Sequence, residues 1–307
     1  MTRPHLQLGL GAGWRPELAL ALERRSDLGF VELLAEDFWS ERSLPVAIEV
    51  LRERGVTMVA HGVSLSLGGA EPLDRDRLAA LARFTRRAHA PLVSEHLAFV
   101  RAGGIESGHL LPLPHTREAL EIVVRNVRAA QAVLPVPLAL ENIATLFEWP
   151  DAEMSESDFL GEVLDRTGAL LLLDLANLYA NARNHGVDAA AYLSSIPLDR
   201  IAYVHMAGGF TDADGLYHDT HAHAVPAPVL ALLRELCARV QPPGVLIERD
   251  DRFPHDAVFN AELDAVAAVL NGPPPCRSDP GPDPGGISAV RPFERSRSVA
   301  SLGMTIP

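Results

Sequence analysis

The stretch VPLALENIATLFEWPDAEMSESDFLGEVLDRTGALLLLD, residues 136–174, decides the fold. It contains an apolar run at 136–140, a segment with helical spacing at 157–166 and a second apolar run at 170–173. Both apolar runs are continuous rather than alternating, which is typical of parallel strands covered on both faces. The segment between them begins with residues that favour the start of a helix, SESD at 155–158. The stretch therefore predicts one strand–helix–strand unit of an α/β protein.

The same unit repeats along the chain. Apolar runs of strand length occur at 6–10, 30–34, 56–60, 92–94, 136–140, 170–173, 201–204 and 245–247. Segments with helical spacing occur at 16–25, 44–54, 74–88, 116–132, 157–166, 188–194, 226–240 and 256–270. Eight strands, each followed by a helix, predict an α/β fold of the (β/α)8 TIM-barrel type. A doubly wound open sheet is the alternative, although no GxGxxG motif follows any strand.

Composition narrows the range of functions. The chain has 307 residues, with 27 basic residues, all of them Arg, against 40 acidic ones, so its formal net charge is −13. This acidic balance disfavours a nucleic-acid partner. Because the chain has no lysine, Schiff-base chemistry, pyridoxal phosphate chemistry and the lysine of a Walker A loop are excluded.

The ends of the chain and its cysteines indicate a cytoplasmic protein. Two cysteines cannot form a disulfide framework or a thiolate zinc site. No apolar run reaches the ~18 residues of a membrane span, and the first residues lack the apolar centre of a signal peptide. We expect a catalytic barrel domain at 1–270. The Pro-, Gly-, Ser- and Arg-rich segment at 271–307 is expected to be a disordered tail.

Seven strands in succession deliver an acidic residue or a histidine to their carboxyl ends. These residues are Glu36, His61, His96, Glu141, Asp174, His205 and Glu248. In a barrel such ends meet at one mouth, where active sites are built. Any one of them alone has a plainer interpretation, a hydrogen-bonded loop residue or a helix cap.

The combination favours bound cations. Four carboxylates crowded in one mouth, Glu141, Asp174, Asp219 and Glu248, would repel one another unless their pKa values rose or cations lay between them. The three histidines beside them favour cations. If residues 218–223, HDTHAH, are extended, Asp219 and His221 point to the same side, as in an Asp-x-His ligand pair. A polar surface loop is the alternative for that segment.

The candidate ligands limit the choice of metal. Histidine and carboxylate ligands without sulfur suit zinc, iron or manganese, and ligand type alone does not choose among them. With Asn177 the set exceeds what one ion can use, so two or three ions are implied. Its nine members are His61, His96, Glu141, Asp174, Asn177, His205, Asp219, His221 and Glu248.

Several strings in the chain carry a resemblance to a known family. They are HGVSLSLG (61–68), SEHLAF (94–99), LLPLPHT (110–116), LENI (140–143), LLLDLANLYANARNHGVD (171–188), VHMAGG (204–209), DTHAHAV (219–225) and LIERD (246–250). From about residue 8 to residue 270 the chain resembles the DUF692, or UPF0276, family, the multinuclear non-haem iron-dependent oxidative enzymes (MNIO).

The resemblance implies a function. It implies a TIM barrel with two to three iron ions (Fe2+/Fe3+) at its mouth, using O2 as co-substrate. Enzymes of this family oxidise a residue, most often Cys, in ribosomally synthesised precursor peptides, and a separate partner protein often presents the peptide leader. We expect both kinds of partner here, and neither nucleic acid nor membrane.

The resemblance also distributes the ligands among ions. His61, His96 and Glu141 would hold the first ion, and Glu141, Asp174, His205 and Glu248 the second. Asn177, Asp219 and His221 would hold the third. The chain departs from the family at residues 174–177, which read Asp-Leu-Ala-Asn where Asp-x-Asn-Asn is common.

Three residues are candidates for the base that deprotonates the substrate: Glu36, His185 and Asp250. Two other functions are open. One is a zinc- or manganese-dependent hydrolase or isomerase on the same barrel, as in endonuclease and sugar-isomerase barrels, which would show no O2 uptake. The other is a non-catalytic protein that contains metal and binds a peptide or a partner.

Overall fold

The computed structural model describes residues 6–40 and 43–272 of the chain. The predicted tail lies outside the described residues except for its first two, so its expected disorder stays a prediction. Within the described part, no helix has both the length and the apolar character needed to cross a membrane.

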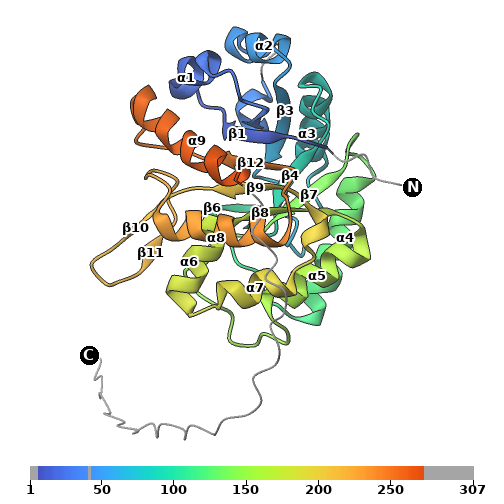
Figure 1. Ribbon diagram of the computed structural model, residues 1–307. Coiled ribbons are helices and arrows are strands. Elements are labelled where there is room, and N and C mark those ends of the chain that lie inside the picture. Colours follow the sequence, from blue (N-terminus) through green and yellow to red (C-terminus); the bar gives the residue numbers. More distant parts are fainter. Residues whose placement is uncertain (1–5, 41–42, 273–307) are drawn as a thin grey trace, which may run out of the picture. The chain divides into compact units, whose positions relative to one another are not determined.

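Eight parallel strands close into a barrel, with the neighbour order β1-β12-β9-β8-β7-β4-β3-β2 (Figure 1). The barrel strands are β1 (Gly9–Gly13), β2 (Phe30–Leu34), β3 (Thr57–Gly62), β4 (Val93–His96), β7 (Leu138–Glu141), β8 (Leu170–Asp174), β9 (Ile201–Met206) and β12 (Gly244–Ile247). This closed parallel sheet confirms the predicted TIM barrel. The open doubly wound sheet is excluded because β1 pairs with both β2 and β12.

Helices surround the barrel. They are α1 (Ala19–Arg24), α2 (Val46–Glu53), α3 (Arg75–Arg87), α4 (Arg117–Gln131), α5 (Glu156–Thr167), α6 (Leu175–His185), α7 (Ala189–Ser195), α8 (Ala227–Arg239) and α9 (Asp256–Leu270). Side-chain oxygens of Asp74, Thr116, Ser155 and Asp188 accept backbone N–H bonds at the starts of α3, α4, α5 and α7.

The structure adds elements that the pattern did not predict. Helix α6 begins at the residue after β8, so Asp174 is both the last strand residue and the cap of the helix. Two antiparallel hairpins project from the barrel strands: β5 (Phe99–Ala102) with β6 (Ile105–Leu111), and β10 (Phe210–Thr211) with β11 (Tyr217–His218). The first strand lies at Gly9–Gly13 rather than at 6–10.

The inside of the barrel changes from apolar to polar along the strands. One buried cluster fills the interior with Leu8, Phe30, Val59, Leu92, Ala139, Leu172, Tyr203 and Leu246, among others. On seven strands, the residue two positions after a member of this cluster is polar. Because alternate residues of a strand share a face, the apolar and the polar side chain point to the same side of the sheet. These polar residues are Glu32, His61, Ser94, Glu141, Asp174, His205 and Glu248, all buried. The apolar cluster thus forms the floor on which the polar group stands.

Candidate metal centre

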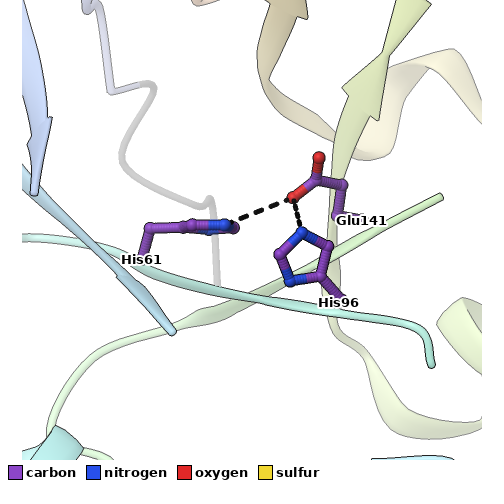
Figure 2. A group of neighbouring side chains, drawn as sticks. All are labelled: His61, His96 and Glu141. Atoms are coloured by element: carbon purple, nitrogen blue, oxygen red, sulfur yellow. Dashed lines mark ion pairs between the residues drawn. The ribbon is translucent and has the colours of Figure 1, made fainter. Parts of the chain in front are cut away.

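Two histidines and a glutamate from three adjacent strands form the first group (Figure 2). Nε2 of His61, on β3, lies 3.6 Å from Oε2 of Glu141, on β7. Nε2 of His96, at the end of β4, lies 3.3 Å from the same oxygen. The two imidazole rings stand edge to face, with centroids 4.7 Å apart. These three side chains are close enough to share one metal ion.

Two further groups continue from the first. Glu141, Asp174 and His205 form one, and Asp174, His221 and Glu248 form the other, so Glu141 and Asp174 each belong to two groups. Nδ1 of His205 lies 3.3 Å from Oε1 of Glu141, 3.7 Å from Oδ2 of Asp174 and 3.2 Å from Oε2 of Glu248. Nδ1 of His221 lies 3.2 Å from the same Glu248 oxygen. Shared carboxylates are the arrangement expected between neighbouring ions.

The donor atoms fit metal ions. Ligands bound at about 2.1 Å to a tetrahedral or octahedral cation are about 3.0–3.5 Å apart. The separations in the three groups cluster around that range. Several donors are buried without a hydrogen-bond partner among the described residues, and burial in that state is costly. They include Oε2 of Glu141, Oδ2 of Asp174, Nδ1 of His205 and Oδ1 of Asp219.

The histidines and carboxylates of the three groups shift one another's pKa values. Burial disfavours the charged form of His96, but Glu141 and Glu95 outweigh it and raise its pKa to about 9. Burial likewise opposes the charge on Glu141, and the neighbouring histidines still lower its pKa to about 2. Burial and the carboxylates of Asp219 and Glu141 raise the pKa of Asp174 well above its usual value. Bound cations would take over the role of these protons.

Three residues behind the histidines orient them, and the prediction did not include any of them. Glu32 is completely buried, and its Oε2 lies 2.9 Å from Nε2 of His205, which leaves Nδ1 directed at the carboxylates. Ser94 Oγ lies 2.7 Å from Nδ1 of His61 and 2.6 Å from the hydroxyl of Tyr203. That hydroxyl donates to Glu32. Such outer partners fix the ring orientation of metal-binding histidines. A carboxylate within the apolar run FVELL was the signal for Glu32.

A buried arginine holds Glu248 from the other side. Arg15, which follows β1, places Nη2 3.2 Å from Oε1 of Glu248 and donates to Asp250 from Nε at 3.0 Å. The bond to Oε1 leaves Oε2 of Glu248 directed at His205 and His221. Asp250 also lies 3.3 Å from Nδ1 of His221. This predicted candidate base is therefore one end of an ion pair.

The residues predicted to bind the third ion lie in a different environment from those predicted to bind the other two. His221 adopts a left-handed backbone with φ of 50°, so the segment after β11 bends there rather than continuing as an extended strand. Asp219 and His221 still meet, with Oδ2 2.9 Å from Nε2. The side-chain amide of Asn177 donates to the carbonyl of Asn142, and its backbone N–H donates to Asp174. Ligation by Asn177 and Asp219 stays a prediction.

We expect Gly208→Ala to displace selectively the segment that carries Asp219 and His221. A Cβ at Gly208, which follows β9, would lie 2.1 Å from the carbonyl oxygen of Ala224 and 2.6 Å from that of His223. Relieving such an overlap costs about 1–3 kcal/mol of unfolding free energy or moves the chain that carries Asp219 and His221. Metal analysis should show loss of part of the metal, with the ion at His61 and His96 retained. Full metal content in a variant of unchanged stability would contradict this prediction.

The other two candidate bases occupy distinct places at the rim. Oε1 of Glu36 accepts bonds from the N–H of Val63 at 3.0 Å and the hydroxyl of Ser64 at 2.6 Å. Burial and the charge of Glu95 raise the pKa of Glu36, and its Oε2 has no partner among the described residues. His185, the last residue of α6, places Nε2 2.8 Å from the carbonyl oxygen of Thr145.

A cavity of about 600 Å³ opens beside the metal groups. Leu97 and Asn142, which directly follow the candidate ligands His96 and Glu141, are among its lining residues. Its outer walls come from the loop after β7 and from α5, α6 and α7. The sequence pattern did not predict this cavity, because its walls are brought together from separate segments.

Glu156 at the wall of this cavity predicts a pH-dependent stability. Burial is the main cause that raises its pKa to about 7, although the hydroxyl of Tyr192 lies within 3.4 Å. The folded chain therefore retains a proton that the unfolded chain has lost, and stability falls as pH rises from about 4.5 towards 7. We expect Glu156→Gln to raise the unfolding free energy at pH 8 by about 1–2 kcal/mol and to change it little at pH 5. Paired thermal melts at the two pH values measure this, and an equal effect at both would contradict it.

Comparison with known proteins identifies the family of the chain. Residues 9–271 match the family model described as "RiPP precursor modification enzyme MbnB/TglH/ChrH", where RiPP denotes a ribosomally synthesised and post-translationally modified peptide. A UPF0276 protein of Streptomyces avermitilis is 53% identical over 270 residues, covering 86% of this chain and 55% of that protein. The chain thus spans little more than half of that relative. A UPF0276 protein of Caulobacter vibrioides is 38% identical over 263 residues, covering 85% and 93%.

Solved structures share the barrel at low sequence identity. Endonuclease IV from Thermus thermophilus has a TM-score of 0.54 and 21% identity, covering 83% of this chain and 99% of that one. D-psicose 3-epimerase from Clostridium cellulolyticum has a TM-score of 0.52 and 14% identity, covering 85% and 95%. These likenesses show the fold alone. The match over residues 9–271 and the identity to the UPF0276 proteins show more: the chain belongs to the MbnB/TglH/ChrH family of RiPP precursor modification enzymes.

Proposed function

We propose that this protein is a multinuclear iron-dependent oxidase that uses O2 to modify a residue, most often Cys in this family, of a ribosomally synthesised peptide. The observation that carries the proposal is the convergence of four histidines and three carboxylates at one end of the barrel, in three groups that share members. A fourth carboxylate, that of Asp219, pairs with His221. Neutral imidazole and carboxylate donors without sulfur are compatible with iron. The family match supports a peptide as the substrate.

The predicted ligands would be divided among two or three ions, and other residues would orient them. His61, His96 and Glu141 would hold one ion, and Glu141, Asp174, His205 and Glu248 a second, with Asn177, Asp219 and His221 for a third. Bound iron would supply electron transfer to O2 and an open position for the substrate. Glu32 and Ser94 hold His205 and His61 in the ring orientation that directs the opposite nitrogen inward. Arg15 fixes Glu248 in the same way.

Deprotonating a thiol or amide of the substrate requires a base at the mouth. Glu36 is the first choice among the three candidates, because burial and the charge of Glu95 raise its pKa and one of its oxygens has no partner among the described residues. Asp250 is paired with Arg15, and His185 is hydrogen-bonded to Thr145. We also propose a separate partner protein that presents the leader of the peptide.

Metal identity tests the proposal directly. Protein purified without oxygen is analysed for metal content, and Mössbauer and EPR spectra are recorded on the same sample. Two to three irons per chain with an antiferromagnetically coupled mixed-valence pair is the expected result. Zinc or manganese without iron and without O2 uptake would instead favour a hydrolase or isomerase. A folded, metal-free protein that still binds peptide would overturn the enzymatic function.

A further inference from the structure

The cavity beside the metal groups has mainly apolar and aromatic walls near its opening. Phe147 and Trp149 stand edge to face, with ring centroids 5.7 Å apart, and are 45% and 40% exposed. The indole N–H of Trp149 donates to the carbonyl of Pro112 at 2.8 Å, which holds the ring in place. Exposed aromatic rings fixed in this way are suited to contact with a ligand, including a cation above a ring face.

The charged groups of the cavity are acidic. Its lining contains Glu148, Glu156, Asp158 and Asp188, and no arginine is among the lining residues of the described chain. Asp158 accepts a bond from Ser155, and Asp188 caps α7. Neither Glu148 nor Glu156 has an arginine partner within residues 6–40 and 43–272. The nearby charge of Glu148 adds to the burial that raises the pKa of Glu156. The cavity therefore has neighbouring acidic groups, Glu148 and Glu156, that no arginine of the described chain pairs with.

Two lining residues of the cavity adjoin members of the metal groups in the sequence. Leu97 and Asn142 line it and directly follow two metal-binding candidates, His96 and Glu141, in the sequence. The backbone carbonyl and the side chain of Asn142 bond to Asn177 and to the backbone of Asp174. A peptide with its reacting residue over the metal groups would have neighbouring residues beside this cavity. Its volume lies within the ~300–1,000 Å³ that is common for ligand sites.

We propose that this cavity binds a basic residue, arginine or lysine, of the peptide substrate, next to the residue that is modified. The apolar stem of the side chain packs against Phe147 and Trp149, and its positive end lies between Glu148 and Glu156. The inference rests on the proposed function only for the identity of the peptide as a substrate. It assigns to Glu148 and Glu156 a role in choosing the sequence around the reacting residue.

The test uses short peptides, so no precursor sequence is needed. The full-length protein with its metals is titrated without oxygen with acetyl-Gly-Arg-Gly-amide and with the neutral isostere that carries citrulline. Lysine and glutamate versions complete the series. Binding is followed by saturation-transfer NMR and by the fluorescence of Trp149, with Trp149→Phe identifying the signal. We expect the arginine and lysine peptides to bind at least tenfold more tightly than the citrulline and glutamate peptides.

Matched variants locate the binding. Glu148→Gln combined with Glu156→Gln should reduce the preference for arginine over citrulline to less than twofold. Glu53→Gln, which makes the same charge change at an exposed residue at the end of α2, should leave the preference unchanged. Equal binding of arginine and citrulline peptides, or a preference that survives in the double variant, would overturn the proposal. Because binding is measured without turnover, a protein without iron that prefers arginine would refute the oxidase and not the cavity.

Discussion

Glu141→Ala should remove bound iron to below about one equivalent per chain and abolish turnover, because Glu141 belongs to two of the three metal groups. Its Oε2 faces His61 and His96, while its Oε1 faces His205. Without it, the group of His61 and His96 retains no carboxylate, and the group of His205 retains only that of Asp174. The loss in activity should exceed the 10- to 100-fold that is typical of removing an outer partner of a ligand.

Folding of the variant is checked separately from its metal content. Glu141 is buried on β7, so circular dichroism and thermal melts accompany the metal analysis. Glu141→Gln keeps the volume of the side chain and removes only its charge, and we expect the same loss of iron. Glu121→Gln, on the exposed face of α4, serves as the control and should keep full iron content. Normal iron and turnover in Glu141→Gln would refute the role of this residue as a bridge.

Glu32→Gln should lower iron affinity by about 10- to 100-fold although Glu32 belongs to none of the three groups. The carboxylate of Glu32 accepts from Nε2 of His205, which makes Nδ1 a stronger donor and fixes the ring. An amide supplies the acceptor without the charge, so the ring stays in place while the basicity of its Nδ1 falls. Competition with a chelator under anaerobic conditions measures the change.

A second variant, at the neighbouring Tyr203, separates the effect of the charge on Glu32 from that of packing around it. Tyr203→Phe removes the hydroxyl that donates to Glu32 and leaves the carboxylate in place. We expect a smaller effect on iron affinity than for Glu32→Gln, with comparable effects on stability, since both side chains are completely buried. If both variants lower affinity equally, the site depends on general packing rather than on the charge behind His205.

The barrel and most members of the metal groups could be predicted from the sequence because both depend on local order. Continuous apolar runs indicate parallel strands, and a closed parallel barrel directs every carboxyl end to one mouth. A histidine or carboxylate at such an end, as at His61 or Glu141, is therefore placed by its position in its own strand. The spacing also predicted that Asp174 ends a strand, although not that α6 begins at the next residue.

The sequence by itself thus determined the eight strands and the residues at their ends. Only the tertiary structure decided which side chains stand behind the candidate ligands and which cavity is formed by the residues that follow them. Glu32 and His205 are 173 residues apart, and Arg15 and Glu248 are 233 apart. These pairs meet because the barrel closes: the side chains of Glu32 on β2 and His205 on β9 meet across its interior, and Arg15 and Glu248 follow the paired strands β1 and β12. The cavity formed by the loop after β7 and by α5, α6 and α7 has the same cause: its walls are distant in sequence, and packing alone brings them together.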